Sequence, residues 1–291
     1  MRSARRRGAD RTSHPMILRC GRYSLPLERP VLMGVLNVTP DSFSDGGRFA
    51  GRGAAAAHAR GMVDAGAAII DIGGESTRPG AQPVFEAEEL ARVLPIIEAL
   101  HDLPVPISVD TRSPAVMRAV LEAGASMIND IEALETQGAL AAVAASGCAV
   151  CLMHKKGAPA SMQTEPRYED VVGEVKSYLA GRIAEAEHAG IARERIVADP
   201  GFGFGKTARH NLELLRRLSE FEALGVPLLV GWSRKTTLGT ITGRAVDGRL
   251  AASLAAALLA AQGGAKILRV HDVGETRDVL AVWQAVRKGE A

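Results

Sequence analysis

The chain has 291 residues, of which 47% are hydrophobic and 23% are charged, a composition ordinary for a soluble globular protein. Its net charge of +2 is uneven, because five arginines and one aspartate within residues 1–11 carry +4 and leave −2 for the remainder, which argues against a nucleic-acid partner. The longest apolar stretch, LAASLAAALLAA, is too short and too rich in alanine to span a membrane.

The first 15 residues are predicted to be a disordered basic extension, with Met16 as an alternative start. They lack the apolar segment of a secretory signal, although an arginine-rich, acid-poor start also imitates a transit peptide. No linker or shift in composition divides residues 30–288. We therefore expect residues 16–291 to form a single domain.

A short β-hairpin is predicted at 17–27, and apolar runs of strand length then alternate with stretches at helical spacing. The predicted strands are 31–37, 68–72, 106–110, 126–130, 148–153, 195–199, 227–232 and 266–270. The predicted helices are 52–65, 86–100, 114–123 (with Ser113 as N-cap), 136–145, 167–189, 208–221, 247–262 and 274–287. Strands that alternate with helices imply a parallel sheet, and eight such units predict a (β/α)₈ TIM barrel, an α/β fold with the hairpin at its bottom.

Two predicted connections are longer than the others. They follow the first and second barrel strands, and both are rich in Gly, Ser and Pro, as VTPDSFSDGGRFAGRG and GGESTRPGAQPVF show. Both leave the carboxyl ends of strands, where barrel enzymes place their chemistry. Long loops of this kind are usually lids or binding loops.

Nearly every predicted barrel strand ends in a polar residue. These residues are Asn37, Asp71, Asp110, Asn129, Asp130, His154, Asp199, Ser233 to Lys235, Arg269 and His271. Carboxylates with an asparagine suit a ligand that offers several N–H donors, and three aspartates alone can chelate a divalent ion. For any one of these residues, capping of the following helix is an alternative explanation. It does not explain well why several of them occur at equivalent strand ends.

The cations that follow the last two strands suit phosphate, since these loops are the frequent phosphate site of such barrels. Phe202 and Phe204 are unusual in a loop, where they can wall a flat ring or fold back onto a neighbouring loop. The glycines of DPGFGFGK imitate a phosphate loop without matching its pattern. His154 ends its strand and its role stays open.

The three cysteines do not form a disulfide framework. Cys148 and Cys151 lie three apart in a strand-like run, so they face opposite sides and cannot jointly hold a metal. We expect buried, reduced thiols, which favour a cytoplasmic protein.

Seven strings of this sequence resemble those of the dihydropteroate synthase family of pterin-binding enzymes. They are MGVLNVTPDSFSDGG at 33–47, DIGGESTRPG at 71–80, SVDTRSPAVMRAVLEAGASMINDI at 108–131, CLMH at 151–154, DPGFGFGKTARHN at 199–211, GWSRK at 231–235 and RVHD at 269–272. The resemblance spans residues 16–288 in the family's order and spacing. It implies a barrel enzyme of folate biosynthesis that joins 6-hydroxymethyl-7,8-dihydropterin pyrophosphate to p-aminobenzoate, giving 7,8-dihydropteroate and pyrophosphate with the help of Mg²⁺.

The resemblance also implies roles for individual residues. Residues that hold the pterin are Asp110, Asn129, Asp199, Lys235 and Arg269, the last stacking on it and reaching phosphate. Asn37 contacts Mg²⁺, and the pyrophosphate end is served by His271, Arg78 and Asp45. The p-aminobenzoate site is shaped by Thr77, Pro79, Phe43, Phe204 and Ser233. The catalytic set is then Asp110, Lys235, Arg269, His271, Asp45 and Arg78.

Residue chemistry agrees with this reading. A pterin presents its 2-amino group and N3–H as a paired donor, which a carboxylate such as Asp199 accepts, and Asn129 can both donate and accept. A departing pyrophosphate needs cations to stabilise its growing charge. One departure from the family is Lys155-Lys156, where an apolar or amide pair is common, and this leaves the role of that loop open.

Two rival readings share the pterin pocket. Corrinoid-linked folate methyltransferases keep similar carboxylates but need no pyrophosphate machinery, whereas Asn37, the ESTRPG loop, SRK and RVHD favour the synthase. The second rival reading is a non-catalytic relative that binds pterin. The resemblance further implies sulfonamide inhibitors as ligands and a homodimer, which fits the apolar excess of the predicted helix 247–262.

Overall fold

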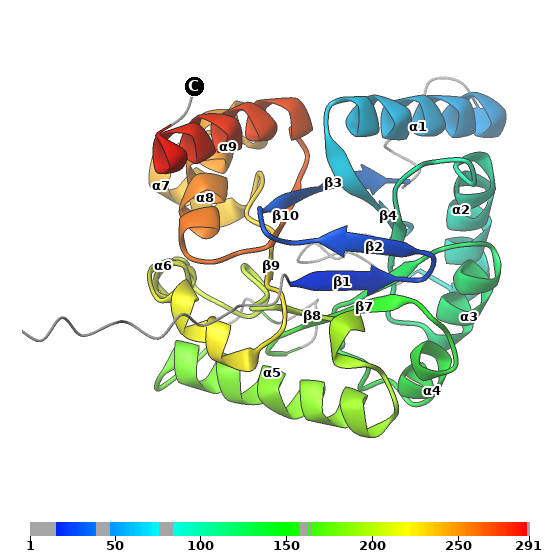
Figure 1. Cartoon of the computed structure of the whole chain (residues 1–291), viewed down its shortest axis with the longest axis horizontal. Coiled ribbons are helices and arrows are strands. Elements are labelled where there is room, and N and C mark those ends of the chain that lie inside the picture. The colour runs from blue at the N-terminus through cyan, green and yellow to red at the C-terminus, as the bar shows by residue number, and fades with distance from the viewer. Residues whose placement is uncertain (1–15, 39–46, 76–83, 158–161, 163–164, 290–291) are drawn as a thin grey trace, which may run out of the picture.

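The computed structural model describes residues 16–38, 47–75, 84–157, 162 and 165–289. Its barrel strands are β3 (Val31–Asn37), β4 (Ala67–Gly73), β5 (Ile107–Asp110), β6 (Met127–Asp130), β7 (Ala149–Met153), β8 (Ile196–Asp199), β9 (Leu229–Val230) and β10 (Ile267–Val270). They pair in parallel in the order β8-β7-β6-β5-β4-β3-β10-β9. A single bridge between Ala198 and Leu228 joins the two ends, so the predicted eight-stranded barrel is confirmed (Figure 1).

Helices surround the barrel. They are α1 (Gly47–Asp64), α2 (Glu86–Ala99), α3 (Pro114–Glu122), α4 (Ala139–Ala144), α5 (Val171–His188), α6 (Ala208–Arg216), α7 (Thr236–Thr242), α8 (Leu250–Gln262) and α9 (Val273–Lys288). Ser113 caps α3 as predicted, since its Oγ accepts from the Val116 N–H at 3.3 Å. In the described part of the chain, no helix has the length and apolar character needed to cross a bilayer.

Several boundaries differ from the prediction. Helix α1 begins at Gly47 rather than at 52, so the loop after β3 is shorter than expected. The predicted helix 208–221 ends at Arg216 and continues as a 3₁₀ segment, Leu218–Leu224. Strand β9 has two residues instead of six. Helix α7 was not predicted, because its Thr- and Gly-rich sequence is a poor intrinsic helix former.

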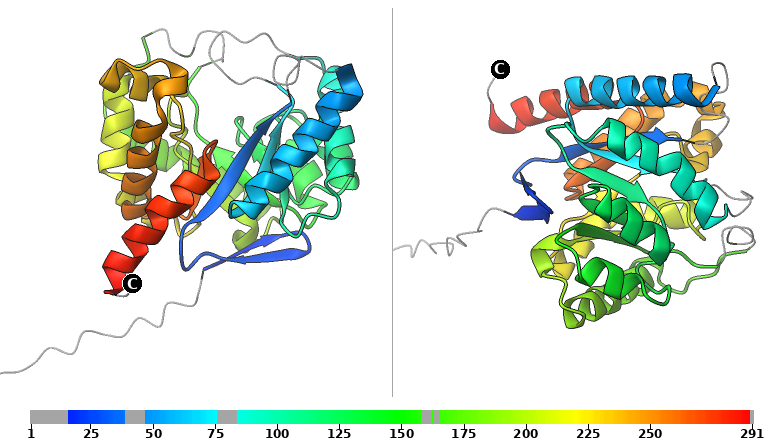
Figure 2. Two further views of the ribbon diagram at one scale, coloured as in Figure 1. Left: turned by 90° about the horizontal axis from the view of Figure 1, so that it is seen from above. Right: turned by 90° about the vertical axis from the view of Figure 1, so that its right-hand side faces the viewer.

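The predicted hairpin consists of β1 (Ile17–Cys20) and β2 (Tyr23–Pro26) and lies across one end of the barrel (Figure 2). Its apolar side chains Leu18 and Cys20, with the following Leu27, are fully buried against the barrel interior. The interior residues of this cluster are Met33, Ile69, Met127, Ala149, Cys151, Val197, Leu229 and Ile267. The hairpin therefore closes the bottom of the barrel, as predicted.

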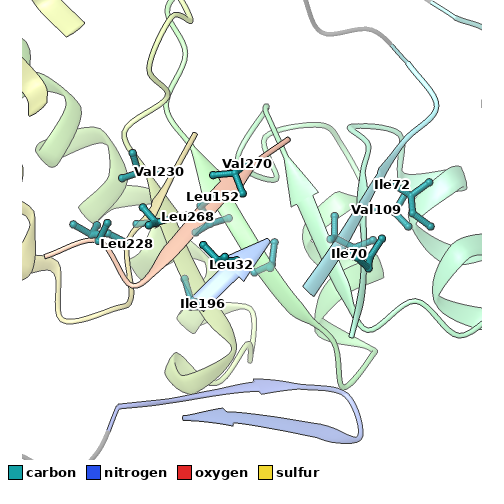
Figure 3. Close-up of a cluster of buried hydrophobic side chains, with 14 of the residues drawn as sticks. Leu32, Ile70, Ile72, Val109, Leu152, Ile196, Leu228, Val230, Leu268 and Val270 are labelled. Atoms are coloured by element: carbon teal, nitrogen blue, oxygen red, sulfur yellow. The ribbon is translucent and has the colours of Figure 1, made fainter. Parts of the chain in front are cut away.

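A second, larger core lies between the strands and the helices. Figure 3 shows its strand side chains, among them Leu32, Ile70, Val109, Leu152 and Leu268, which alternate with the inward-pointing residues. Cys148 belongs to this outer core and Cys151 to the interior cluster, so the two thiols face opposite sides as predicted. All three cysteines are free and buried. Residues 1–15 lie outside the described residues, and their disorder stays a prediction.

Candidate active site

The inward-pointing side chains are apolar near the bottom of the barrel and become polar two residues further along each strand. We call the lower, apolar layer the apolar floor. Because alternate residues of a strand share a face, Ile69 is followed inward by Asp71, Met127 by Asn129, Val197 by Asp199 and Ile267 by Arg269. Asp110 ends β5 at the same level. The barrel thus carries a charged layer at its mouth, directly above a sealed apolar layer, as the strand-end pattern predicted.

Asp71 organises this layer. Its carboxylate is fully buried and accepts hydrogen bonds from Arg269 Nε at 2.6 Å, Asn129 Nδ2 at 3.2 Å and Ser108 Oγ at 2.6 Å. Arg269 also reaches Asp110, with Nη2 3.2 Å from Oδ2. The sequence predicted Asp71 only as one of several strand-end carboxylates for a ligand or a metal, and not as the partner of Arg269.

Burial dominates the electrostatics of the two remaining carboxylates. It raises the pKa of Asp110 to about 7, with Arg269 opposing the shift and Asp71 adding to it. Burial also raises the pKa of Asp199, while Lys235 opposes that shift. Asp199 is held in place by the Gly201 N–H, which donates to its Oδ1 at 2.7 Å.

Lys235 and the two phenylalanines meet above Asp199. The Lys235 ammonium donates to the Phe202 carbonyl and lies 4.5 Å from the centre of the Phe204 ring. Desolvation lowers the pKa of Lys235 to about 8, and Asp199 opposes the shift. Phe202 is buried against Trp232, with ring centres 5.0 Å apart, so it folds back. Phe204 is half-buried and is the phenylalanine able to face a ligand.

Ser233 and His271 form a pair beside this group. The Ser233 Oγ lies 2.9 Å from His271 Nδ1 and accepts the His271 backbone N–H at 3.3 Å. His271 and Asn37 line a cavity of about 670 Å³ together with residues of α1 and α9. Arg234 lies at this cavity too, but it pairs with Asp272 at the start of α9, Nε to Oδ2 being 3.3 Å.

The loop after β7 is tied down by the two lysines that depart from the family pattern. Lys155 pairs with Glu132 at 2.8 Å, and Lys156 donates to the Arg167 carbonyl at 2.6 Å while lying over the Tyr168 ring. Neither lysine is bonded to the charged layer in these contacts. His154 is buried beside Lys206, a residue that sequence reasoning read only as part of a glycine-rich loop.

Five predicted site residues lie outside the described residues, so their roles stay predictions: Phe43, Asp45, Thr77, Arg78 and Pro79. Within the described ranges, no group of three or more His, Cys, Asp or Glu side chains can hold a metal ion. Asn37 offers one amide oxygen at the end of β3. Since Mg²⁺ usually keeps waters and takes phosphate oxygens beside one or two protein ligands, this donor fits a metal that arrives with a pyrophosphate.

Comparison with known proteins gives a consistent result. Residues 33–271 match the family model described as pterin binding enzyme. The chain is 52% identical over 263 residues to the dihydropteroate synthase of Escherichia coli K12, covering 90% of this chain and 93% of that protein. The structure of the Xanthomonas albilineans dihydropteroate synthase with 4-aminobenzoic acid superposes with a TM-score of 0.89 at 52% identity, over 94% of this chain and 99% of that one. That of the Yersinia pestis enzyme with a sulfonamide drug gives 0.89 at 47% identity, over 94% and 100%.

Proposed function

This chain belongs to the pterin-binding enzyme family, and we propose that it is a dihydropteroate synthase. It condenses 6-hydroxymethyl-7,8-dihydropterin pyrophosphate with p-aminobenzoate to give 7,8-dihydropteroate and pyrophosphate. The observation that carries this conclusion is the charged layer of Asp110, Asn129 and Asp199 beside Lys235 and Arg269, set above a sealed apolar floor.

The acceptors of this layer match one edge of a pterin. Asp199 accepts from the 2-amino group and N3–H, Asn129 both donates and accepts, and Lys235 donates to the pterin carbonyl. Arg269 is steadied by two carboxylates and lies 22% exposed, so its guanidinium can stack on the ring. Because these donors and acceptors are preorganised, binding spends little energy on ordering them.

We assign the leaving group to the side of the site that borders α1 and α9. His271 and Asn37 border one cavity there, which supports their assignment to the pyrophosphate end. Bound Mg²⁺ would neutralise the charge that grows on the pyrophosphate oxygens, with Asn37 as its protein ligand. Ser233, predicted for the p-aminobenzoate site, pairs with His271, predicted for the pyrophosphate end, which supports two substrate sites that adjoin.

A pyrophosphate-release assay with both substrates and Mg²⁺ tests the function. A synthase releases pyrophosphate in step with dihydropteroate. A corrinoid-linked methyltransferase or a non-catalytic pterin binder releases none. Release that ignores p-aminobenzoate concentration and gives no dihydropteroate would contradict the proposal.

We assign the second substrate to the side of the site that Phe204 borders, and the roles of Phe43, Thr77 and Pro79 beside it stay predictions. Sulfonamides, which are analogues of p-aminobenzoate, are expected to compete with it. Inhibition competitive only with the pterin substrate would contradict this placement. The three buried, unpaired thiols support the expectation of a reducing compartment such as the cytoplasm.

Helix α8 supports the expected homodimer. Its barrel-facing stripe is made of small residues, Ser253, Ala256, Ala257 and Ala260. Two of its leucines are exposed, Leu250 by 39% and Leu259 by 52%, while Leu254 and Leu258 are half-buried. Ile241 and Val246, nearby in sequence, are also exposed. An apolar face of this kind is typical of an interface between copies. A strictly monomeric mass in light scattering at micromolar concentration would contradict the dimer.

A further inference from the structure

Lys206 is a buried lysine with an unusual set of partners. It is 2% exposed, and its Nζ lies 2.9 Å from the Gly201 carbonyl, 3.0 Å from the Phe204 carbonyl, 3.3 Å from the His154 carbonyl and 2.9 Å from His154 Nδ1. An ammonium has three N–H donors and no acceptor, so a cluster of four acceptors matches its charged form. A lone lysine buried this deeply is costly unless such partners are present.

The partners belong to two loops that touch closely. Gly201 and Gly205 have φ angles of 69° and 62°, a left-handed conformation that favours glycine. A Cβ at Gly201 would overlap the His154 carbonyl, and one at Gly205 would overlap the Lys156 carbonyl. The loop after β8 therefore lies directly on the backbone that follows β7. Lys206 is bonded to carbonyls of both segments, His154 after β7 and Gly201 and Phe204 after β8.

Two of the residues bonded to Lys206, Gly201 and Phe204, also contact side chains of the proposed site. The Gly201 N–H fixes the Asp199 carboxylate at 2.7 Å, while the Gly201 carbonyl accepts from Lys206. Phe204, whose carbonyl also accepts from Lys206, carries the ring under Lys235. One ammonium is thus bonded to both the residue that orients the pterin acceptor and the residue that offers the aromatic wall.

We propose that Lys206 is a positioning residue for both substrates, which acts through the loop after β8 with His154 as its neutral acceptor. It touches neither substrate, and the inference rests on the proposed synthase function. Burial lowers the pKa of His154 to about 3, with Lys206 adding to the shift, so the ring is neutral at neutral pH. Lys206 Nζ, 2.9 Å from Nδ1, favours the tautomer in which Nδ1 is the acceptor. Burial also lowers the pKa of Lys206, and Asp199 is the charge that opposes this most.

The test replaces Lys206 by methionine, which keeps the length of the side chain and removes its donors. Lys206→Met is expected to raise the KM of both substrates by about tenfold or more, because small displacements of binding groups have effects of this size or larger. The Kd of the free pterin, from calorimetry, is expected to rise in parallel. The matched control is Lys266→Met at the opposite end of the barrel, where the backbone N–H of residue 266 bonds to Leu228 and no site residue is involved; its constants should be unchanged.

A merely structural role predicts a different pattern. Such a variant has a lower melting temperature or a smaller active fraction, but the folded molecules keep the KM values of the wild type. Folded Lys206→Met with both KM values within about twofold of wild type overturns the proposal, since only the amount of active enzyme has then changed.

The histidine gives an independent route if Lys206→Met fails to fold. His154→Asn offers Oδ1 near the place of Nδ1 and should retain both KM values, whereas His154→Leu removes the acceptor and should raise both. Equal constants in these two variants overturn the proposal. ¹⁵N spectra of labelled histidine should show an unprotonated Nδ1 in His154 at pH 7, and a protonated one would also overturn it. Wild-type pyrophosphate release, measured first, separates a failure of this proposal from a failure of the proposed function.

Discussion

Asp71 Oδ2 lies 2.6 Å from Arg269 Nε, which joins two strands, β4 and β10, that flank β3 without being paired to each other. The pair spans 198 residues of sequence and sits at the edge between the apolar interior and the mouth. The direction of the Arg269 guanidinium, which we propose stacks on the pterin, is therefore set by a fully buried carboxylate.

Asp71→Asn should reduce kcat/KM for the pterin substrate by about tenfold to a hundredfold, because the guanidinium loses its fixed partner and a small misplacement is costly. The unfolding free energy should fall by about 3 kcal/mol, as when one partner of a buried ion pair is removed. Steady-state kinetics and urea denaturation measure the two effects. Ser108→Ala is the control, since Ser108 bonds to the other oxygen of Asp71; it should cost about 1 kcal/mol and leave kcat/KM nearly unchanged. Equal kinetic losses in both variants would refute the positioning role of Asp71.

Asn37→Ala should impair Mg²⁺-supported turnover more than it impairs binding of a free pterin. Asn37 lies at the cavity that His271 borders, away from the Asp199 carboxylate that we assign to the pterin edge. Turnover as a function of Mg²⁺ concentration and calorimetry with a pterin lacking pyrophosphate make the comparison. An equal loss of turnover and of pterin binding would contradict a role of Asn37 in contacting the metal.

Departure of pyrophosphate is expected to run ahead of attack by the amine. p-Aminobenzoate is a weak nucleophile, and the dihydropterin ring can delocalise positive charge, which the Asp110 carboxylate favours when it is ionised. We expect Lys235, Arg269 and His271 to stabilise the leaving group. With Mg²⁺ but no amine, slow pyrophosphate release with a trapped or hydrolysed pterin is expected. No cleavage without the amine, and a rate that rises steeply with amine basicity, would indicate a concerted displacement instead.

His154 should make the protein sensitive to mild acid. Its pKa is lowered in the folded state to about 3, so protonation favours the unfolded chain, whose histidine titrates at 6.5. The stability that neutral His154 provides is complete above about pH 6.5 and is lost as the pH falls toward 3, at up to about 1.4 kcal/mol per pH unit. Denaturation of wild type and His154→Asn between pH 7 and pH 4 should give a smaller slope for the variant. Parallel curves would rule this out.

The inward placement of Asp110, Asn129 and Asp199 was predictable, because strand periodicity and the end of each apolar run locate a residue on the barrel without any tertiary information. The same reasoning located the hairpin and separated Cys148 from Cys151. It also located Asp71, but a strand end says nothing of which neighbour a carboxylate bonds to. The bond to Arg269 depends on closure of the whole sheet.

Other features depend on contacts that a local pattern does not contain. Helix α7 has β-branched threonines and forms where Thr237 accepts from Asn211 Nδ2 at 3.1 Å, a contact 26 residues away. In the sequence Lys206 is only the last residue of a glycine-rich string, and the approach of the loop after β7, which buries it, cannot be predicted from that string. Arg234 belonged by sequence to the strand-end cations, yet its pairing with Asp272 turns it toward α9.

The hairpin that closes the barrel lies outside the part of the sequence that matches the family. Residues 33–271 carry the family match and the charged layer, while Leu18, Cys20 and Leu27, which seal the interior from below, precede that stretch. With the hairpin in place, the bottom of the barrel is closed, so solvent approaches the charged layer from the mouth. Without it, the apolar interior layer of Met33, Ile69 and Met127 would lose its cover and face water from below. A segment that precedes the family match thus supports, from the far end of the barrel, the apolar layer on which the charged layer rests.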